Sequence, residues 1–176
     1  MKTFRQYIEF IDDKSKLLEL KVLEKLNELG LEYFIYEHPP LRTVEESKAL
    51  RGEMHGGHTK NLFLRDKKKK NYLITVNENQ KIDLKFLESE LSSGRLSFGS
   101  PERLSQFLGV KPGAVSPLAL LNDKHNDVSF FIDHNLLSEN ILNFHPLVNH
   151  LTVSIKVTDF KYFLKSQNKF YNEIYF

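Results

Sequence analysis

A single lysine, Lys60, stands between a glycine-rich stretch, "HGGH" (residues 55–58), and an apolar run, "NLFL" (residues 61–64). Lysines usually lie on the surface, where water solvates the ammonium group. The four lysines at 67–70 are of this ordinary kind, but Lys60 is expected at the junction of a loop and a strand. Spacing alone favours a strand-end lysine paired with a surface acid, and a lysine that serves a reaction is the alternative.

The histidines of the same stretch, His55 and His58, are three residues apart and would share one face of a helix. The two glycines between them disfavour a helix there, so the pair is a weak metal signal. The chain has no cysteine, which excludes a disulfide, a thiolate nucleophile and a cysteine-ligated metal. It also lacks a G-x-S-x-G elbow, a phosphate-binding P-loop and an H-E-x-x-H zinc helix.

The composition is that of one globular domain: 176 residues, 40% hydrophobic and 27% charged. No apolar run approaches the ~20 residues of a membrane span. The start of the chain, "MKTFRQYIEFIDD", carries acids where a signal peptide has an apolar centre, so we expect a cytoplasmic protein. The net charge of +2 is small for a dedicated nucleic-acid binder. A protein that binds only the end of an RNA, however, needs few phosphate contacts, so its net charge can stay near zero.

The apolar patterns mix helices and strands without the regular alternation of a doubly wound fold. Helices are expected over residues 4–11 and 18–29, after a capping box at 43–46, over 84–91 and 100–109, and from 158 onward. Strands are expected over 31–38, 61–66, 72–77, 127–133, 151–157 and 169–176. Asp83 and Ser100 are the expected N-caps of their helices. This mixture favours an α+β fold with a largely antiparallel or mixed sheet.

Four further stretches form a characteristic set: "GGHTKNLFLRD" (56–66), "GVKPGAVSPLALLND" (109–123), "FFIDHNLL" (130–137) and "NFHPLVN" (143–149). Each is weak alone, but together and in this order they closely resemble the YbaK/prolyl-tRNA-synthetase-associated editing domain family. The resemblance is strongest to the free-standing branch that hydrolyses alanyl-tRNA(Pro). It runs from about Gly30 to the C-terminus, so we expect a helical extension over 1–30 and the editing domain over 31–176. It implies one compact α+β domain around a curved mixed sheet flanked by helices.

Members of this family remove a wrongly attached amino acid from tRNA(Pro), which implies an aminoacyl-tRNA deacylase. The implied partners are the acceptor end of tRNA(Pro) and prolyl-tRNA synthetase. Editing is needed because a pocket shaped for proline rejects a smaller amino acid by only ~1–3 kcal/mol. The "FHPL" stretch (144–147) favours alanine, because the branch that removes cysteine generally lacks it. Two alternatives stay open: a cysteinyl-tRNA(Pro) deacylase, and a non-catalytic tRNA- or nucleotide-binding module of the same fold.

The resemblance implies catalytic roles for Lys60 and His145. Lys60 matches a pocket lysine at the start of a strand, where an ammonium group can bind the terminal adenosine or stabilise charge on the ester oxygen. His145 matches the histidine of the "FHP" stretch, and Pro146 after it restricts its backbone to an extended form. Its expected role is to shape the amino-acid pocket, to order water or to act as a base. A hydrogen-bonded structural histidine is the alternative.

The resemblance also implies substrate contacts by four residues: Asn61, Gly113, Ser116 and Asp133. Gly113 would line the pocket with backbone N–H groups, or be a plain turn glycine. Asp133 would orient Lys60, hold the α-amino group of the substrate, or cap the helical turn that follows it, and the cap is the favoured reading. The family mechanism uses the 2′-hydroxyl of the terminal adenosine to position water, while protein groups orient the substrate and stabilise the oxyanion. We expect a monomer with no metal, no cofactor and no covalent intermediate.

Three features depart from the family pattern or lie outside it. His150 stands where relatives often have a small residue, so it would narrow the pocket or alter the approach of tRNA. The N-terminal helices would pack against the domain, or contact tRNA or a synthetase. The lysines at 67–70 are expected to form a solvated hairpin tip, with contact to acceptor-stem phosphates as the alternative.

Overall fold

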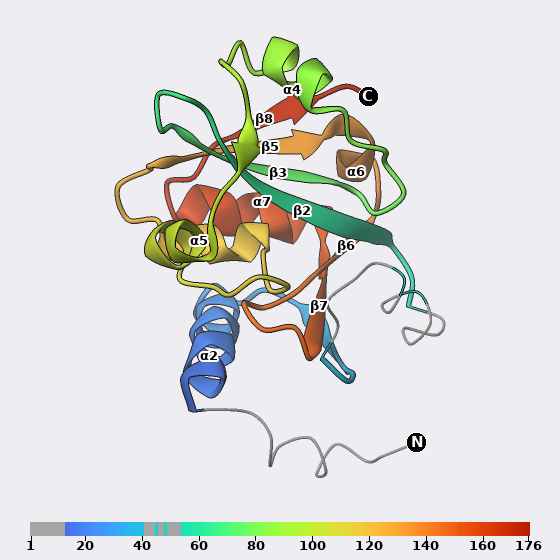
Figure 1. The fold of residues 1–176 in the computed structure, drawn as a ribbon. Helices are drawn as coiled ribbons and strands as arrows, with labels where there is room; N and C mark the ends of the chain where they lie inside the picture. The colour runs from blue at the N-terminus through green and yellow to red at the C-terminus, as the bar shows by residue number, and fades with distance from the viewer. Residues whose placement is uncertain (1–12, 41–44, 46–47, 49–53) are drawn as a thin grey trace.

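The computed structural model describes residues 13–40, 45, 48 and 54–176 (Figure 1). Its helices are α2 (Asp13–Glu28), α4 (Leu84–Glu90), α5 (Pro101–Leu108), the 3₁₀ helix η1 (Pro117–Asn122), α6 (His134–Leu137) and α7 (Val157–Ser166). Its strands are β1 (Tyr33–Glu37), β2 (Gly57–Arg65), β3 (Asn71–Asn77), β4 (Ser97–Phe98), β5 (Val128–Asp133), β6 (Ile141–Phe144), β7 (Leu151–Lys156) and β8 (Tyr171–Ile174). Within the described part of the chain, no helix is both long and apolar enough to cross a membrane.

The strands form one mixed sheet in the order β1-β7-β6-β2-β3-β5-β8, and the short β4 pairs with β2. Strand β2 lies at its centre. It is antiparallel to β3 from Thr59 to Arg65, but it is parallel to β6 over Gly57 and His58 alone. The two strands separate after this short pairing, and their separation makes room for a pocket. The mixed sheet with flanking helices confirms the predicted α+β class.

Helices cover both faces of the sheet (Figure 1). Helices α2, α5, α7 and η1 share one large core with one face, to which Leu73 of β3 contributes. Helix α4 packs on the other face, where Leu87 meets Ile74 of β3 in a second core. Neighbouring residues of one strand thus enter different cores, because successive side chains point to opposite faces. Both faces of the central strands are therefore held by apolar packing.

Helix α2 is part of the folded domain. Val22 and Leu26, four residues apart, have no exposed surface and belong to the large core. The helix ends before Gly30, whose φ of 65° lies in the left-handed region, as the C-terminal signal predicts. The helix expected over residues 4–11 lies outside the described residues, and so do Thr43 and Glu46, the two ends of the expected capping box.

The predicted helix caps are confirmed. The Asp83 carboxylate accepts a hydrogen bond from the backbone N–H of Lys85 at 2.8 Å, at the start of α4. The Ser100 hydroxyl accepts one from the N–H of Arg103 at 3.2 Å, at the start of α5. Gly109 ends α5 with a φ of 68°. Short-range sequence signals are sufficient to predict where these helices begin and end, because each capping residue bonds to unpaired backbone groups of its own helix.

The predicted loop before Lys60 is wrong, because β2 begins at Gly57 and Lys60 lies inside the strand. The two glycines allow β2 to approach β6. A Cβ on Gly56 would lie 2.6 Å from the carbonyl oxygen of Ile141, and one on Gly57 would lie 3.0 Å from Leu142. The short elements β4, β6 and η1 were not predicted, whereas α6 is the helical turn expected after Asp133.

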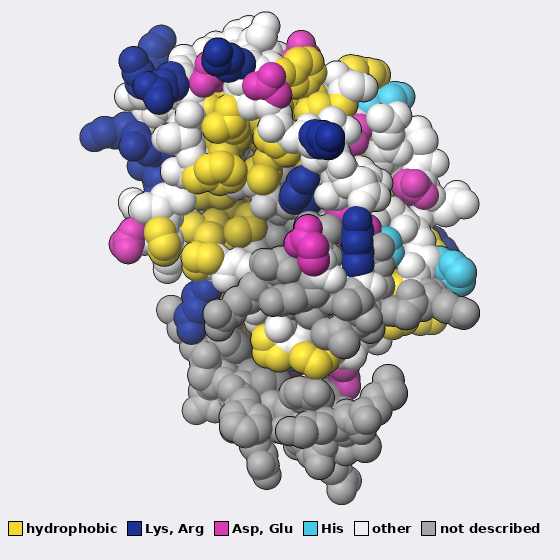
Figure 2. Space-filling model, turned by 45° about the vertical axis from the view of Figure 1, so that its right-hand side comes forward, with side chains coloured by type: hydrophobic (Ala, Val, Ile, Leu, Met, Phe, Trp, Pro, Cys, Tyr) yellow, Lys and Arg dark blue, Asp and Glu magenta, His cyan; other side chains and the backbone are white. Residues whose placement is uncertain are grey.

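The β2–β3 turn carries the lysines at 67–70, which are all exposed. The carboxylate of Asp66, only 3% exposed, accepts a hydrogen bond from the N–H of Lys70 at 2.9 Å. Arg103 of α5 donates to the carbonyl of Lys69 at 2.5 Å, so helix and turn are joined. Figure 2 shows Lys and Arg side chains at one corner of the molecule, next to an area of apolar side chains.

Candidate functional site

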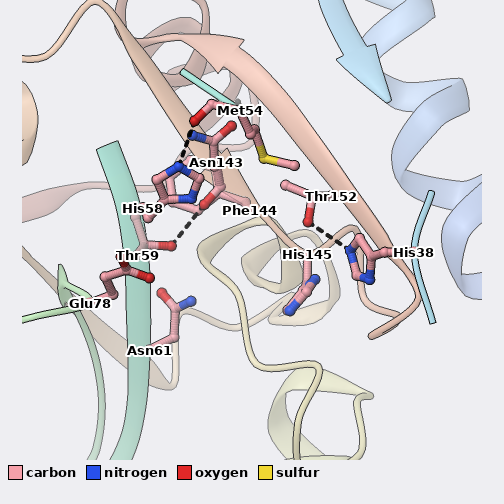
Figure 3. A pocket seen from close by; sticks show the side chains of 10 residues that line it. All are labelled: His38, Met54, His58, Thr59, Asn61, Glu78, Asn143, Phe144, His145 and Thr152. Atoms are coloured by element: carbon pink, nitrogen blue, oxygen red, sulfur yellow. Dashed lines mark hydrogen bonds between the residues drawn. The ribbon is translucent and has the colours of Figure 1, made fainter. Parts of the chain in front are cut away.

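A pocket of about 40 Å³ lies where β2 and β6 separate (Figure 3). Strands β2, β6 and β7 line it, together with the segment before β2 and the segments after β1, β3 and β6. Ten described residues line it: His38, Met54, His58, Thr59, Asn61, Glu78, Asn143, Phe144, His145 and Thr152. Two of the predicted site residues, Asn61 and His145, are therefore brought together.

His145 is held as a neutral ring. Its Nδ1 lies 2.7 Å from the carbonyl oxygen of Leu151 and must donate to it, which leaves the lone pair on Nε2. Burial lowers the pKa of His145 to about 4, although the bond to Leu151 opposes this and nearby His38 and His150 add to it. At neutral pH Nε2 can therefore accept a hydrogen bond, as a water-ordering group requires, but the low pKa makes the ring a weaker base than an ordinary histidine.

A second histidine, His38, stands beside it. The ring centroids of His38 and His145 are 5.7 Å apart. The Nδ1 of His38 donates to the carbonyl of Pro39 at 2.9 Å, and its Nε2 accepts from the Thr152 hydroxyl at 2.9 Å. Burial lowers the pKa of His38 as well. Sequence analysis did not single out His38, although it precedes a proline just as His145 does.

The floor of the pocket is fixed by Asn143 of β6. Its Nδ2 donates to the carbonyl of His55 at 2.9 Å, its Oδ1 accepts from the Ser154 hydroxyl, and its own carbonyl accepts from the Thr59 hydroxyl at 2.9 Å. His58 donates from Nε2 to the carbonyl of Met54 at 2.9 Å. These bonds join β2 to β6 and β7. Across the described ranges, no group of three or more His, Cys, Asp or Glu residues is placed to hold a metal ion.

Asn61 presents its amide N–H groups to the pocket. Its Oδ1 accepts a hydrogen bond from the hydroxyl of Thr75 at 2.7 Å, and Thr75 has no exposed surface. This bond occupies the amide oxygen and so orients the Nδ2 group as a donor. In Figure 3 the amide of Asn61 is directed toward the side of the pocket where His145 lies. Asn61 therefore offers a hydrogen-bond donor to a polar substrate group, and Nε2 of His145 offers an acceptor.

Lys60 lies next to Asn61 on β2 but does not line the pocket. Its Nζ donates to the carbonyl of Gln80 at 2.6 Å, beyond the end of β3. Partial burial lowers the pKa of Lys60, Glu45 and Glu78 raise it, and Lys48 lowers it further. Because successive side chains of a strand point to opposite faces, Lys60 and Asn61 project from opposite sides of β2. The ammonium group therefore lies outside the pocket lining, although Glu78 acts on it electrostatically. Its catalytic role stays a prediction.

The other predicted contacts lie outside the pocket lining. Gly113 forms a turn with a φ of 89°. Ser116, which has no exposed surface, accepts a hydrogen bond from the N–H of Leu118 at the start of η1. Asp133 is 1% exposed and its carboxylate accepts a hydrogen bond from the N–H of Asn135 at 2.9 Å. Asp133 therefore caps α6, which confirms the favoured interpretation. Substrate contacts by these residues stay predictions.

His150 also lies outside the lining. Its Nε2 is 3.0 Å from a carboxylate oxygen of Glu19, and its side chain is 9% exposed. The ring therefore ties α2 to the segment before β7. This contact gives His150 a structural role between the N-terminal helix and the sheet.

Known proteins are similar to this chain in sequence. The model of the aminoacyl-tRNA editing domain matches residues 38–163. The prolyl-tRNA editing protein ProX of Acetoanaerobium sticklandii is 38% identical over 154 residues, which cover 87% of this chain and 94% of that protein. The prolyl-tRNA synthetase associated domain-containing protein 1 of Mus musculus is 36% identical over 85% of this chain and 90% of its own length.

A solved structure, described as a candidate trans-editing enzyme for prolyl tRNA synthetase, has the same fold. It superposes with a TM-score of 0.66 at 19% identity, over 93% of this chain and 97% of its own. The family model and the relatives together cover the pocket and the elements that build it. The chain belongs to the aminoacyl-tRNA editing domain family.

Proposed function

We propose that this protein is a trans-editing deacylase that hydrolyses the ester bond of mischarged tRNA(Pro), with alanyl-tRNA(Pro) as its substrate. The observation that carries the proposal is the pocket itself, in which the neutral ring of His145 and the oriented amide of Asn61 meet. The match to a relative named as a prolyl-tRNA editing protein supports the choice of tRNA(Pro).

In the proposed reaction, water attacks the carbonyl carbon of the ester. The bond from that carbon to the ribose oxygen breaks, and the ribose oxygen leaves with a proton, so the products are a free amino acid and intact tRNA. Nε2 of His145 orders the water or takes its proton, assisted by the 2′-hydroxyl of the terminal adenosine. Nδ2 of Asn61 donates to the carbonyl oxygen, on which negative charge develops.

Lys60 acts from outside the pocket lining in this proposal. Its Nζ is bonded to the neutral carbonyl of Gln80, 2.6 Å away. An anionic phosphate accepts a stronger hydrogen bond than a neutral carbonyl. The flexible lysine stem allows the ammonium group to exchange Gln80 for the phosphate of the terminal adenosine. Lys60 would then hold the end of the tRNA while the ester lies in the pocket.

The logic of editing and the "FHPL" stretch support alanine as the amino acid removed. A synthetase pocket built for proline cannot strongly reject alanine, so a second site that admits only the smaller residue completes the selection. The "FHPL" stretch at 144–147 favours alanine over cysteine, because the branch of the family that removes cysteine generally lacks this stretch.

The test is the release of amino acid from alanyl-, cysteinyl- and prolyl-tRNA(Pro) by the purified protein. We expect fast release of alanine and no release of proline above the spontaneous rate. Release of cysteine alone would replace the substrate and keep the reaction. Binding of tRNA(Pro) with no release from any of the three would instead establish a non-catalytic module.

A further inference from the structure

We infer that Glu78 binds the α-ammonium group of the aminoacyl substrate and so selects esters with a free amine. This inference rests on the proposed function and adds to it the residue that recognises the amino end of the substrate.

The position of Glu78 supports this role. Glu78 directly follows β3, and its backbone N–H donates to the carbonyl of His58 at 2.9 Å, which fixes it against β2. It is 8% exposed and lines the pocket. Figure 3 shows its side chain beside Thr59 and Asn61, with His145 on the other side of the pocket. An amine at Glu78 would therefore leave the ester between Asn61 and His145.

The charges in the pocket favour the same placement. An α-amino group has a pKa of about 7.7–8.0, so it is largely cationic at pH 7. Burying this cation without an anionic partner is costly. Among the described residues that line the pocket, Glu78 has the one carboxylate, and burial lowers the pKa values of His38 and His145 so that both stay neutral.

Asp133, the other acid considered for the amino group, has a different task. Its carboxylate is 1% exposed, caps α6 through the N–H of Asn135 and does not line the pocket. Glu78 is thus the acid that the fold places at the substrate. Glu78 also raises the pKa of Lys60, as does Glu45, so a purely electrostatic effect on Lys60 must be separated from substrate binding.

The experiment compares alanyl-tRNA(Pro) with N-acetylalanyl-tRNA(Pro), in which the amine is neutral. The wild type should prefer the free amine by about 10- to 100-fold in kcat/KM, the range for one charged hydrogen bond. Glu78→Gln should lose this preference, mainly through a higher KM for the alanyl substrate. Glu45→Gln is the matched control, because it removes the other acid that raises the Lys60 pKa and should keep the preference.

A wild type that hydrolyses both esters equally would overturn the inference without any variant. So would a Glu78→Gln protein, folded by circular dichroism, that keeps the wild-type preference. Glu78→Asp retains the carboxylate and should retain part of the preference.

A binding arm separates this inference from the proposed function. Calorimetry with 3′-alanylamido-3′-deoxyadenosine and its N-acetyl form measures recognition of the amine without hydrolysis. If the wild type hydrolyses no ester but binds the free amine more tightly through Glu78, the proposed function fails and the inference stands. Equal binding of both compounds contradicts the inference.

Discussion

His38 and His145 lie side by side with their ring centroids 5.7 Å apart, and each donates its Nδ1 proton to a backbone carbonyl. The first ring is contributed by the segment after β1 and the second by the segment after β6. Burial lowers both pKa values, and two protonated rings at this distance would repel each other. The pocket is therefore built around two neutral imidazoles. Nε2 of His38 accepts from the Thr152 hydroxyl, whereas Nε2 of His145 can accept a hydrogen bond from the substrate or from water.

The pH dependence of the reaction should reflect this neutral state. With the pKa of His145 near 4, the ring remains a proton acceptor throughout the neutral range. Single-turnover release of alanine, corrected for spontaneous hydrolysis, should therefore show no His145-dependent inflection between about pH 5 and about pH 8. An inflection near pH 6.5 that His145→Gln abolishes would show that the ring titrates normally.

The stability of the protein should fall as the pH is lowered through the same groups. An unfolded histidine takes up a proton near pH 6.5, whereas the folded His145 does so only near pH 4. The unfolded state thus binds more protons in this window, and the free energy of unfolding decreases from about pH 6.5 to about pH 4. Urea midpoints measured at about pH 7 and about pH 5 should differ less in His145→Gln than in the wild type. An equal difference would assign the effect to other groups.

The role of Asp133 can be tested by a substitution that keeps the cap and removes the charge. Asparagine is as good an N-cap as aspartate, whereas alanine in its place costs about 0.5–2 kcal/mol. We expect Asp133→Asn to retain the activity and Asp133→Ala to lower the free energy of unfolding by about 1 kcal/mol. Loss of activity in a stable Asp133→Asn protein would instead support a direct substrate contact.

The close approach of β2 to β6 makes Gly56 harder to replace than a glycine in open space. A Cβ at Gly56 would meet the Ile141 carbonyl oxygen at 2.6 Å, whereas one at Gly30 would meet nothing within 4 Å. Both glycines have a positive φ, 97° at Gly56 and 65° at Gly30, so an alanine at either position would be strained by the left-handed backbone conformation. Gly56→Ala should therefore destabilise the protein by about 1–3 kcal/mol more than Gly30→Ala, measured by urea unfolding. Equal losses would mean that the backbone conformation accounts for the whole cost.

The elements that sequence analysis predicts well are those with local signals. The α5 helix has its cap at Ser100, a proline at its first position and Gly109 at its end, so no distant residue is needed to define it. Strand β6 has only four residues, Ile141–Phe144, and is held through its pairing with β2 and β7. Such pairing is not visible in the local pattern, and the glycines that permit it are typical of a loop.

The residues of the site were predictable only in part. The family resemblance points to Asn61 and His145, and the fold brings both to the pocket. His38 joins them through the pairing of β1 with β7, across more than half of the chain. Glu78 lies in "NEN" (77–79), which is typical of an exposed turn, and becomes a buried acid through its contact with β2. Burial of this kind depends on the assembled fold.

The role of this pocket is tested most directly by the single-turnover release of alanine from alanyl-tRNA(Pro) by the wild type, His145→Gln and His150→Gln. The two histidines are five residues apart, but His145 lines the pocket and His150 contacts Glu19 outside it. We expect His145→Gln to lower the rate by about 100-fold, the lower end of the range for loss of a general base, and His150→Gln to retain most of the wild-type rate. Wild-type activity in a folded His145→Gln protein would contradict the placement of the reaction in this pocket.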